Sequence, residues 1–101
     1  MMLLVCFDLP RDTKENRKEA TKYHKKLVEL GFTMKQFSVY EREVRQNSTR
    51  DRVIKVLKDR LPKSGAITLY LLPNEVNDSQ ITILGSESVK KTVRKPQFIV
   101  L

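Results

Sequence analysis

The sequence has few of the residues on which several common kinds of protein site depend. Its 101 residues include one cysteine, Cys6, and one histidine, His24. Two such side chains cannot supply the four nitrogen or sulfur ligands of a structural zinc site, and one cysteine cannot form an internal disulfide. His24 falls in the middle of a predicted helix, outside its apolar stripe, so a nucleophile activated by a histidine base has little support. We interpret Cys6 as a strand-core residue and His24 as a solvated or partly packed one.

The glycines and the apolar residues also exclude whole classes of protein. Gly31, Gly65 and Gly85 are too widely spaced to form a phosphate-binding loop, and each is explained by a turn or a helix end. No apolar stretch reaches the roughly 18 residues of a transmembrane helix, and the N-terminus lacks the layout of a secretion signal. Together with the single cysteine, these absences predict a cytoplasmic protein that does not contact a membrane.

The sequence does contain a large excess of positive charge. Twenty lysines and arginines outnumber twelve aspartates and glutamates, which gives a formal net charge of +8. This excess favours polyanions such as nucleic acids as partners. A chain of this length has room for one domain with one modest hydrophobic core.

An apolar run that ends on an acid is the most informative segment. Residues 2–7 are apolar on both faces, which predicts a central strand covered on both sides, and Asp8 follows at its exposed end. A carboxylate in that place can hold a divalent cation, while the surrounding basic residues hold phosphate. The alternative is an ordinary turn aspartate before Pro10.

Hydrophobic periodicity predicts the remaining elements and a fold. We expect the elements to follow one another along the chain as strand, helix, strand, strand, helix, strand, with the strands in an antiparallel sheet. This order favours an α+β, ferredoxin-like split βαβ sandwich over residues 1–85. The predicted segments are a helix over 13–30 capped by Asp12, a strand over 32–40, a helix that begins at Ser48 or Thr49, and strands over 66–72 and 80–84.

The helices of such a sandwich cover one sheet face and leave the other bare. A bare apolar face of about several hundred Å² is uncommon on a monomer, so we expect a two-fold homodimer. Residues 86–101 are expected to be a basic linker and a C-terminal fifth strand that is exchanged onto the sheet of the partner protomer. Pairing within the chain's own sheet is the alternative. The expected partner contacts are Phe98, Ile99, Val100 and Leu101.

Basic residues gather on the first predicted helix. At about 100° per residue, four lysines from Lys14 to Lys25 fall within one quadrant, and Arg11 and Arg17 lie near the helix start. Guanidinium groups bind phosphate with two parallel hydrogen bonds, and a helix N-terminus adds partial positive charge. A solvated face with intrahelical ion pairs is the alternative. The predicted nucleic-acid-binding residues are Arg11, Lys14, Arg17 and Lys18.

Aromatic residues offer little for base recognition in this sequence. Phe7, Phe32, Phe37 and Tyr70 all have positions in the predicted core. Stacking platforms for single strands need exposed rings. We therefore expect contacts to phosphate and to the shape of a duplex, with steep salt dependence and weak sequence preference.

Two-fold symmetry would supply a second copy of Asp8 as a metal ligand. One carboxylate binds Mg²⁺ weakly, because the ion needs octahedral oxygen coordination. If the dimer forms through the bare face, Asp8 and its symmetry mate converge and bridge one Mg²⁺ or another divalent cation, with backbone carbonyls or Ser38 completing the shell. Asp8 is therefore the predicted metal ligand and the predicted catalytic residue.

Several motifs resemble one known family along nearly the whole chain. They are Val5-Cys6-Phe7-Asp8-Leu9-Pro10, Arg17, Gly31-Phe32 and Gln36-Phe37-Ser38-Val39-Tyr40-Glu41, and they are similar to the small CRISPR-associated adaptation protein, also called the CRISPR-associated endoribonuclease. The resemblance implies a ferredoxin-like homodimer that joins the larger CRISPR integrase subunit and helps to insert foreign DNA into the CRISPR array.

The resemblance also implies roles for single residues. The aspartate that matches Asp8 is the Mg²⁺ ligand of a nuclease activity on RNA or DNA, whereas in the integration complex the family acts mainly as a scaffold that spans double-stranded DNA. Phe7 stands where many relatives have tyrosine, which removes a hydroxyl near the metal. A stand-alone toxin-type ribonuclease of similar fold is the alternative function.

Overall fold

The main sheet is built around β1 (Met2–Asp8), which is apolar up to its last residue. It pairs antiparallel with β3 (Val39–Glu43) on one side and with β4 (Ala66–Leu72) on the other. β2 (Thr33–Gln36) pairs antiparallel with β3 and completes the strand order β2-β3-β1-β4. Both the antiparallel sheet and this order agree with the α+β prediction.

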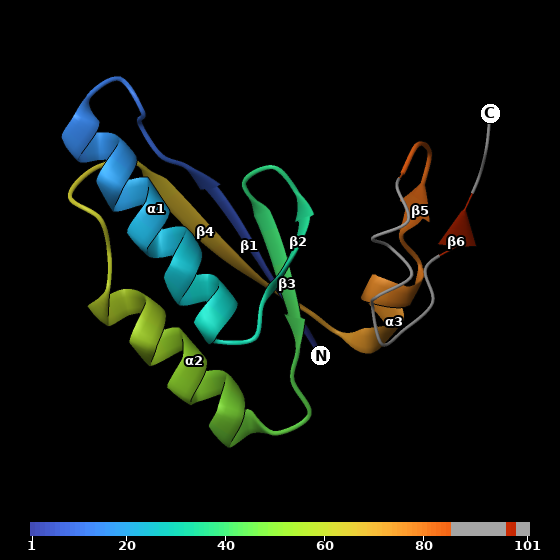
Figure 1. The fold of residues 1–101 in the computed structure, drawn as a ribbon. Helices are drawn as coiled ribbons and strands as arrows, with labels where there is room; N and C mark the ends of the chain where they lie inside the picture. The colour runs from blue at the N-terminus through green and yellow to red at the C-terminus, as the bar shows by residue number, and fades with distance from the viewer. Residues whose placement is uncertain (86–96, 99–101) are drawn as a thin grey trace.

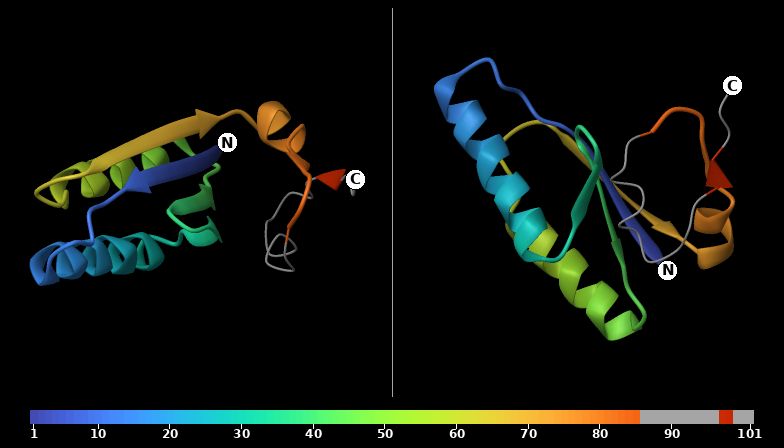
Figure 2. Two further views of the ribbon diagram at one scale, coloured as in Figure 1. Left: turned by 90° about the horizontal axis from the view of Figure 1, so that it is seen from above. Right: turned by 45° about the vertical axis from the view of Figure 1, so that its right-hand side comes forward.

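The structure, a computed structural model, describes residues 1–85 and the backbone of residues 97–98 (Figure 1). α1 (Lys14–Glu29) and α2 (Asn47–Asp59) lie on the same face of the sheet, as two further views also show (Figure 2). We call the opposite sheet face the far face. Within the described residues, every helix is too short or too polar to cross a bilayer.

The hydrophobic core fills the space between the sheet and these two helices. Each side chain that is fully buried there stabilises the fold by about 1.5–3 kcal/mol relative to an exposed one. Helix and strand periodicities both direct apolar residues into this layer. The buried residues of the cluster are Leu3, Val5, Tyr23, Leu27, Phe32, Tyr40, Val44, Val53 and Leu57.

α1 begins one residue later than the predicted cap requires. Thr13 is the N-cap, because its side-chain oxygen accepts a hydrogen bond from the backbone N–H of Asn16 (3.0 Å). Asp12 instead accepts a hydrogen bond from the side-chain amide of Asn16 (2.8 Å), which lowers the pKa of Asp12. The prediction that Asp12 caps the helix is therefore wrong, although both residues order the same turn.

α1 ends at Gly31 as predicted, through a Schellman motif. The N–H of Gly31 donates to the carbonyl of Val28, and the N–H of Phe32 donates to the carbonyl of Leu27, both at 3.0 Å. Gly31 has a φ of +87°, which a residue without a Cβ adopts easily. Phe32 thereby enters the core beside Leu27.

The segment predicted as one strand over 32–40 is a β-hairpin. β2 ends at Gln36, Phe37 and Ser38 form the turn, and β3 starts at Val39. Ser38 takes a φ of +64°, and its carbonyl accepts a hydrogen bond from the N–H of Phe7 (3.0 Å). The hairpin supplies the two consecutive strands that the predicted element order requires.

α2 packs on the core through its apolar residues, but it begins differently from the prediction. Val53 and Leu57 are buried against the core. Gln46 occupies the N-cap position without a side-chain hydrogen bond, so Ser48 and Thr49 lie inside the first turn and neither caps the helix. The predicted cap is therefore wrong, and α2 relies on packing more than on capping.

The residues after β4 differ most from the sequence expectations. α3 (Asn74–Asp78) was not predicted, and the strand expected over 80–84 is only β5 (Ile81–Thr82). β5 pairs in parallel with β6 (Gln97–Phe98) in a small separate sheet. Phe98 thus lies in a strand paired within its own chain, while Ile99, Val100 and Leu101 are outside the described residues. Exchange of this strand with a partner stays a prediction.

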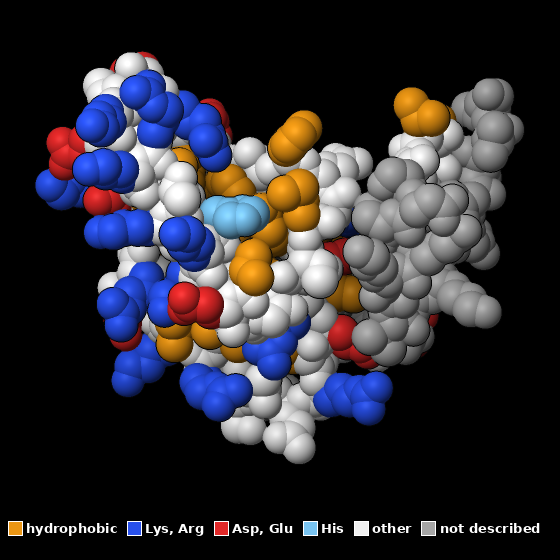
Figure 3. Space-filling view, in the orientation of Figure 1, with side chains coloured by type: hydrophobic (Ala, Val, Ile, Leu, Met, Phe, Trp, Pro, Cys, Tyr) orange, Lys and Arg blue, Asp and Glu red, His pale blue; other side chains and the backbone are white. Residues whose placement is uncertain are grey.

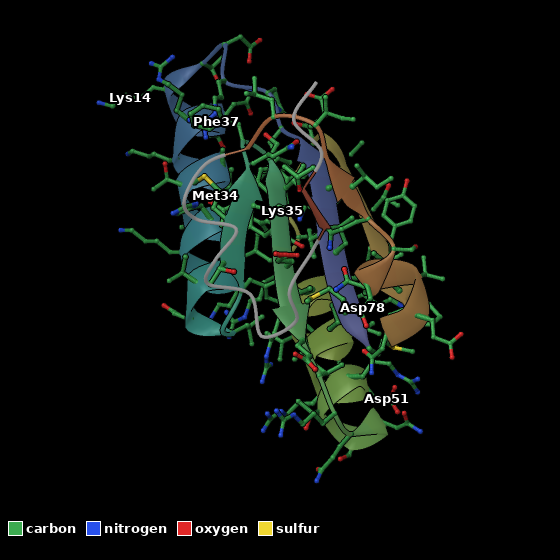
Figure 4. All side chains as sticks on the ribbon, turned by 90° about the vertical axis from the view of Figure 1, so that its right-hand side faces the viewer. Lys14, Met34, Lys35, Phe37, Asp51 and Asp78 are labelled. Carbon is green, nitrogen blue, oxygen red and sulfur yellow. The ribbon has the colours of Figure 1, made fainter. Side chains whose placement is uncertain are left out.

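α3 and the residues that follow it lie on the far face, so that face is less bare than expected. Figure 4 looks onto the sheet from this side. Lys35 of β2 donates a hydrogen bond to the side-chain oxygen of Gln80, and the side-chain amide of Gln80 donates to the carbonyl of Asn77 (3.0 Å). Met2 and Glu41 are buried beneath this end of the face.

Candidate functional site

Asp8 lies on the far face, at the end that α3 does not cover. It is the last residue of β1, its register partner is Ala66 of β4, and its side chain is exposed. The ring of Phe7 stacks on Tyr40 in the core layer, with centroids 5.7 Å apart, so strand alternation directs Asp8 to the opposite face. Tyr70 of β4 lies on the same face and is 50% exposed, so the core position predicted for it is wrong.

The chemistry of Asp8 suits a hard divalent cation, but one chain supplies only part of such a site. Carboxylate oxygens are the ligands that Mg²⁺ prefers. No group of three or more histidine, cysteine, aspartate or glutamate side chains that could hold a metal occurs among the described residues. Ser38, expected to complete the shell, lies in the hairpin turn and lines a hollow on the helix side of the sheet. The described residues therefore supply one exposed carboxylate toward such a site, and the predicted pairing with a second Asp8 stays a prediction.

Gly65 lies directly against the end of β1. At its φ of +109°, an added Cβ would lie 2.8 Å from the backbone oxygen of Asp8 and 2.7 Å from a methyl carbon of Leu9. We expect Gly65→Ala to lower the free energy of unfolding by about 3 kcal/mol, because a backbone clash adds to the strain of positive φ. At Gly31, φ +87°, an added Cβ meets only the flexible side chain of Arg42 at 3.3 Å, so the matched change should lower it by about 1 kcal/mol. Urea denaturation measures both, and equal losses would contradict the proposed contact with Asp8.

The lysines predicted to share one side of α1 are all exposed. Figure 3 shows Lys and Arg side chains gathered along this helix. Among the described residues none of the four forms a salt bridge, because Glu15 pairs with Lys63 (3.3 Å) and Glu29 pairs with Lys26 (2.9 Å). The alternative of a face with intrahelical ion pairs is supported only at Lys25, because the pKa of Glu29 is lowered first by the hydrogen bond from Lys26 and further by the charge of Lys25. We call this set the lysine ridge: Lys14, Lys18, Lys22 and Lys25.

The two predicted arginines flank the start of α1 and are both exposed. The guanidinium of Arg17 donates a hydrogen bond to the backbone carbonyl of Arg11 (3.1 Å), which fixes the turn between β1 and the helix. Arg11 lies near the hairpin, where its positive charge partly offsets the rise that burial causes in the pKa of Tyr40. The four predicted nucleic-acid-binding residues thus share one end of the molecule, while Asp8 faces the other side of the sheet.

Sequence reasoning missed a hollow of about 540 Å³ between α1 and the hairpin. Phe37, predicted as a core residue, is 91% exposed at its edge, and that prediction is wrong. The two-residue turn at Phe37–Ser38 takes Phe37 out of the strand alternation on which the prediction relied. We call it the helix-face hollow, and it is lined by Phe7, Arg11, Thr21, His24, Met34, Phe37, Ser38 and Tyr40.

His24 and Tyr40 form the polar part of this hollow. The Tyr40 hydroxyl and His24 Nδ1 are hydrogen-bonded, and the two rings meet edge to face with centroids 5.3 Å apart. Burial raises the pKa of Tyr40 above its usual value. His24 is partly packed, in agreement with the sequence interpretation.

Glu41 is an acid buried on the covered end of the far face, with 4% of its surface exposed. Burial raises the pKa of its carboxyl, and Lys35, whose Nζ lies 3.8 Å away, partly offsets that rise. Because the folded pKa lies above the usual value, the native state binds the proton more tightly than the unfolded chain. The contribution of Glu41 to the free energy of unfolding therefore declines as the pH rises from its pKa in the unfolded chain to its higher pKa in the folded protein.

Comparison with known proteins gives consistent matches. A family model described as CRISPR associated protein Cas2 matches residues 1–80. Two proteins named CRISPR-associated endoribonuclease Cas2 are similar in sequence. The one from Streptococcus mutans serotype c is 45% identical over 69 residues, which cover 68% of this chain and 63% of the relative. The one from Ligilactobacillus salivarius is 38% identical over 88 residues, or 86% of each chain.

A solved structure gives the same indication at the level of the fold. The crystal structure of Streptococcus pyogenes Cas2 at pH 6.5 superposes with a TM-score of 0.59 at 30% sequence identity. The match covers 72% of this chain and 87% of that one.

Proposed function

This chain belongs to the CRISPR-associated protein Cas2 family, and we propose that it acts in CRISPR adaptation as a homodimer that binds duplex DNA and bridges subunits of the larger integrase. The exposed lysine ridge supports the DNA-binding part, because exposed lysines that form no salt bridge with the described residues are free to contact phosphates. Many spread contacts of this kind suit a duplex backbone better than a small anion.

The observation that carries the proposal is the position of Asp8. Its exposed carboxylate projects from the open end of the far face, which also carries Tyr70 and the partly exposed Leu4 and Cys6 further along the strands. A face that carries partly exposed apolar side chains and an exposed carboxylate is suited to a second copy, which would cover the apolar side chains and bring two carboxylates together. Without a cation the two acids would repel each other.

We propose further that the pair of Asp8 carboxylates supports phosphodiester cleavage, the activity in the names of the curated relatives. A divalent cation such as Mg²⁺, when bound there, supplies a Lewis acid that polarises a phosphoryl oxygen and lowers the pKa of a bound water. The chain's own contribution is to hold each carboxylate at a fixed strand end. Asp8, the last residue of β1, is still paired with Ala66 of β4.

Cleavage and scaffolding are separable parts of the proposal. The scaffold needs the dimer, the lysine ridge and contacts with the integrase, and the C-terminal residues Phe98 to Leu101 are the proposed contacts with the partner protomer. Cleavage needs the dimer, the two Asp8 carboxylates and a divalent cation. An array-expansion assay with Asp8→Ala distinguishes them, since persistence of expansion shows that scaffolding is the biological role.

Charge placed on the far face tests the dimer. Tyr70 and Val28 are 50% and 52% exposed, but Tyr70 lies on the far face and Val28 on α1. We expect Tyr70→Glu to weaken the dimer at least about 100-fold, because the two-fold axis buries two added charges. Val28→Glu adds the same charge elsewhere and should leave the dimer intact. Sedimentation velocity measures both, and a Tyr70→Glu chain that stays dimeric would contradict assembly through this face.

A further inference from the structure

Phe37 is a large aromatic side chain that the fold holds in solvent. It is 91% exposed at the tip of the β2–β3 hairpin. The turn that carries it is fixed on its other side, because the carbonyl of Ser38 accepts a hydrogen bond from the N–H of Phe7 in the central strand. A ring presented in this way is positioned by the backbone and buries almost nothing within its own chain, so the fold itself gives it no packing role.

The helix-face hollow beside Phe37 combines apolar, polar and positively charged groups. Met34, 44% exposed, lies on the same side as Phe37, and both are on the side of the hairpin where α1 runs (Figure 4). The stacked rings of Phe7 and Tyr40 form the floor of the hollow. Its volume of about 540 Å³ is within the range of about 300–1,000 Å³ typical of small-ligand sites.

The charge around the hollow is of one sign. Arg11 is among its lining residues, and none of the lining residues is acidic. Thr21 and His24 reach the hollow from α1, and at about 100° per residue the lysine ridge occupies the neighbouring strip of that helix. Figure 3 shows basic side chains next to the histidine and the hydrophobic side chains around it. A polyanion that lies along the ridge therefore passes the mouth of the hollow.

We propose that the helix-face hollow binds one unpaired nucleotide of the bound nucleic acid. The base stacks on the exposed ring of Phe37, and its phosphate pairs with the guanidinium of Arg11. His24 Nδ1 is engaged by Tyr40, which leaves Nε2 for the edge of the base. This site goes beyond the phosphate contacts of the proposed function but rests on that function, because the ridge must first bring nucleic acid to this surface.

The hollow can accept an unpaired nucleotide but not a nucleotide that is paired within a duplex. A paired base is stacked and cannot enter a hollow, so the ligand must come from a single-stranded end of DNA or from single-stranded RNA. Both sources offer the same chemistry, a planar base with an adjacent phosphate. The probes of the test separate them.

Two substitutions at one exposed position provide the test. Phe37→Leu keeps an apolar side chain but removes the aromatic face, whereas Phe37→Trp keeps the face, and neither change disturbs the core at a position that is 91% exposed. The probes are a blunt DNA duplex, the same duplex with a short single-stranded overhang, and a single-stranded RNA. Fluorescence anisotropy at one fixed salt concentration gives the affinities, and Leu61→Ala, at another exposed apolar residue, is the control.

The expected result is a loss that is specific to unpaired bases. Phe37→Leu should weaken binding of the overhang duplex or of the RNA by about tenfold, with blunt-duplex affinity unchanged, and Phe37→Trp should bind as the unchanged protein does. The probe that loses affinity identifies the source of the nucleotide. A 2-aminopurine placed in the unpaired segment should also be quenched by the unchanged protein and less by Phe37→Leu.

Other results overturn the proposal in distinguishable ways. Equal affinities of Phe37→Leu and Phe37→Trp for every probe would show that the ring does not stack on a base. Equal weakening for blunt and overhang duplexes, together with a changed sedimentation coefficient, would identify Phe37 as a protein contact. Failure of the unchanged protein to bind any probe would reject the proposed function itself, and this site with it.

Discussion

Asp8→Asn should reduce divalent-cation-dependent cleavage of nucleic acid at least about 100-fold and leave duplex binding unchanged. The amide keeps the shape of the side chain but removes the charge that holds a hard cation, and the two-fold axis removes it twice. Asp8 is exposed and outside the core, so the fold should tolerate the change. The measurement is cleavage of a labelled oligonucleotide with Mg²⁺ and with EDTA.

Asp12→Asn is the matched control for that change. Asp12 is also exposed, lies four residues further along the chain and contacts Asn16, in the turn that leads into α1. The Asp12→Asn change should leave the rate of cleavage unchanged. It should lower the free energy of unfolding only slightly. Cleavage that survives in Asp8→Asn and still needs the metal would place the catalytic group elsewhere.

Mixed dimers test whether the two copies of Asp8 act together. If one cation needs both carboxylates, only dimers with two unchanged chains cleave. Random pairing of equal amounts of unchanged and Asp8→Asn chains then leaves about a quarter of the activity. If each chain acts alone, about half remains. The titration therefore distinguishes a shared site from two independent ones without a structure of the dimer.

Removing the lysine ridge should have the largest effect on DNA affinity. Changing all four of its lysines to glutamine should weaken blunt-duplex binding on the order of 100-fold at low salt. If each lysine contacts one phosphate, the slope of log affinity against log salt should become less steep by up to about 3.6 for each protomer that contacts the duplex, since each contact contributes about 0.9. Anisotropy titrations over a salt series measure both quantities.

An equal change of charge on α2 is the control for the ridge. Arg52, Lys55, Lys58 and Arg60 are exposed on or next to that helix, and their replacement by glutamine lowers the net charge by the same amount. We expect a smaller loss of affinity and a smaller change of slope. Equal effects of the two sets would show that overall charge, and not the ridge, attracts the duplex.

Strong periodicity allowed the sequence to predict the central part of the fold. β1 and β4 were recognised from apolar residues bounded by Pro10 and Pro73, and α1 from its apolar spacing and Gly31. The hairpin was missed because Gln36-Phe37-Ser38-Val39 contains no glycine, asparagine or proline, the residues that usually mark such a turn. α3 was missed because five mostly polar residues carry no periodic signal.

The candidate site was predictable where it depends on single charged residues. The strand-end position of Asp8 and the exposure of the basic residues on α1 follow directly from local pattern. Phe37 could not be placed in this way, since its exposure depends on a turn only two residues long that reverses the chain. The covered end of the far face was also hidden from the sequence, because it depends on a long-range contact between Lys35 and Gln80.

At the end of β1 next to the hairpin, a single layer of backbone separates the two faces of the sheet. Phe7 directs its ring to the helices and the next residue, Asp8, directs its carboxylate away from them. The hydrogen bond from the N–H of Phe7 to Ser38 joins this strand end to the hairpin. A polynucleotide that rounds this end of the sheet would therefore meet a basic, aromatic surface and an acidic one on the two sides of a single peptide unit.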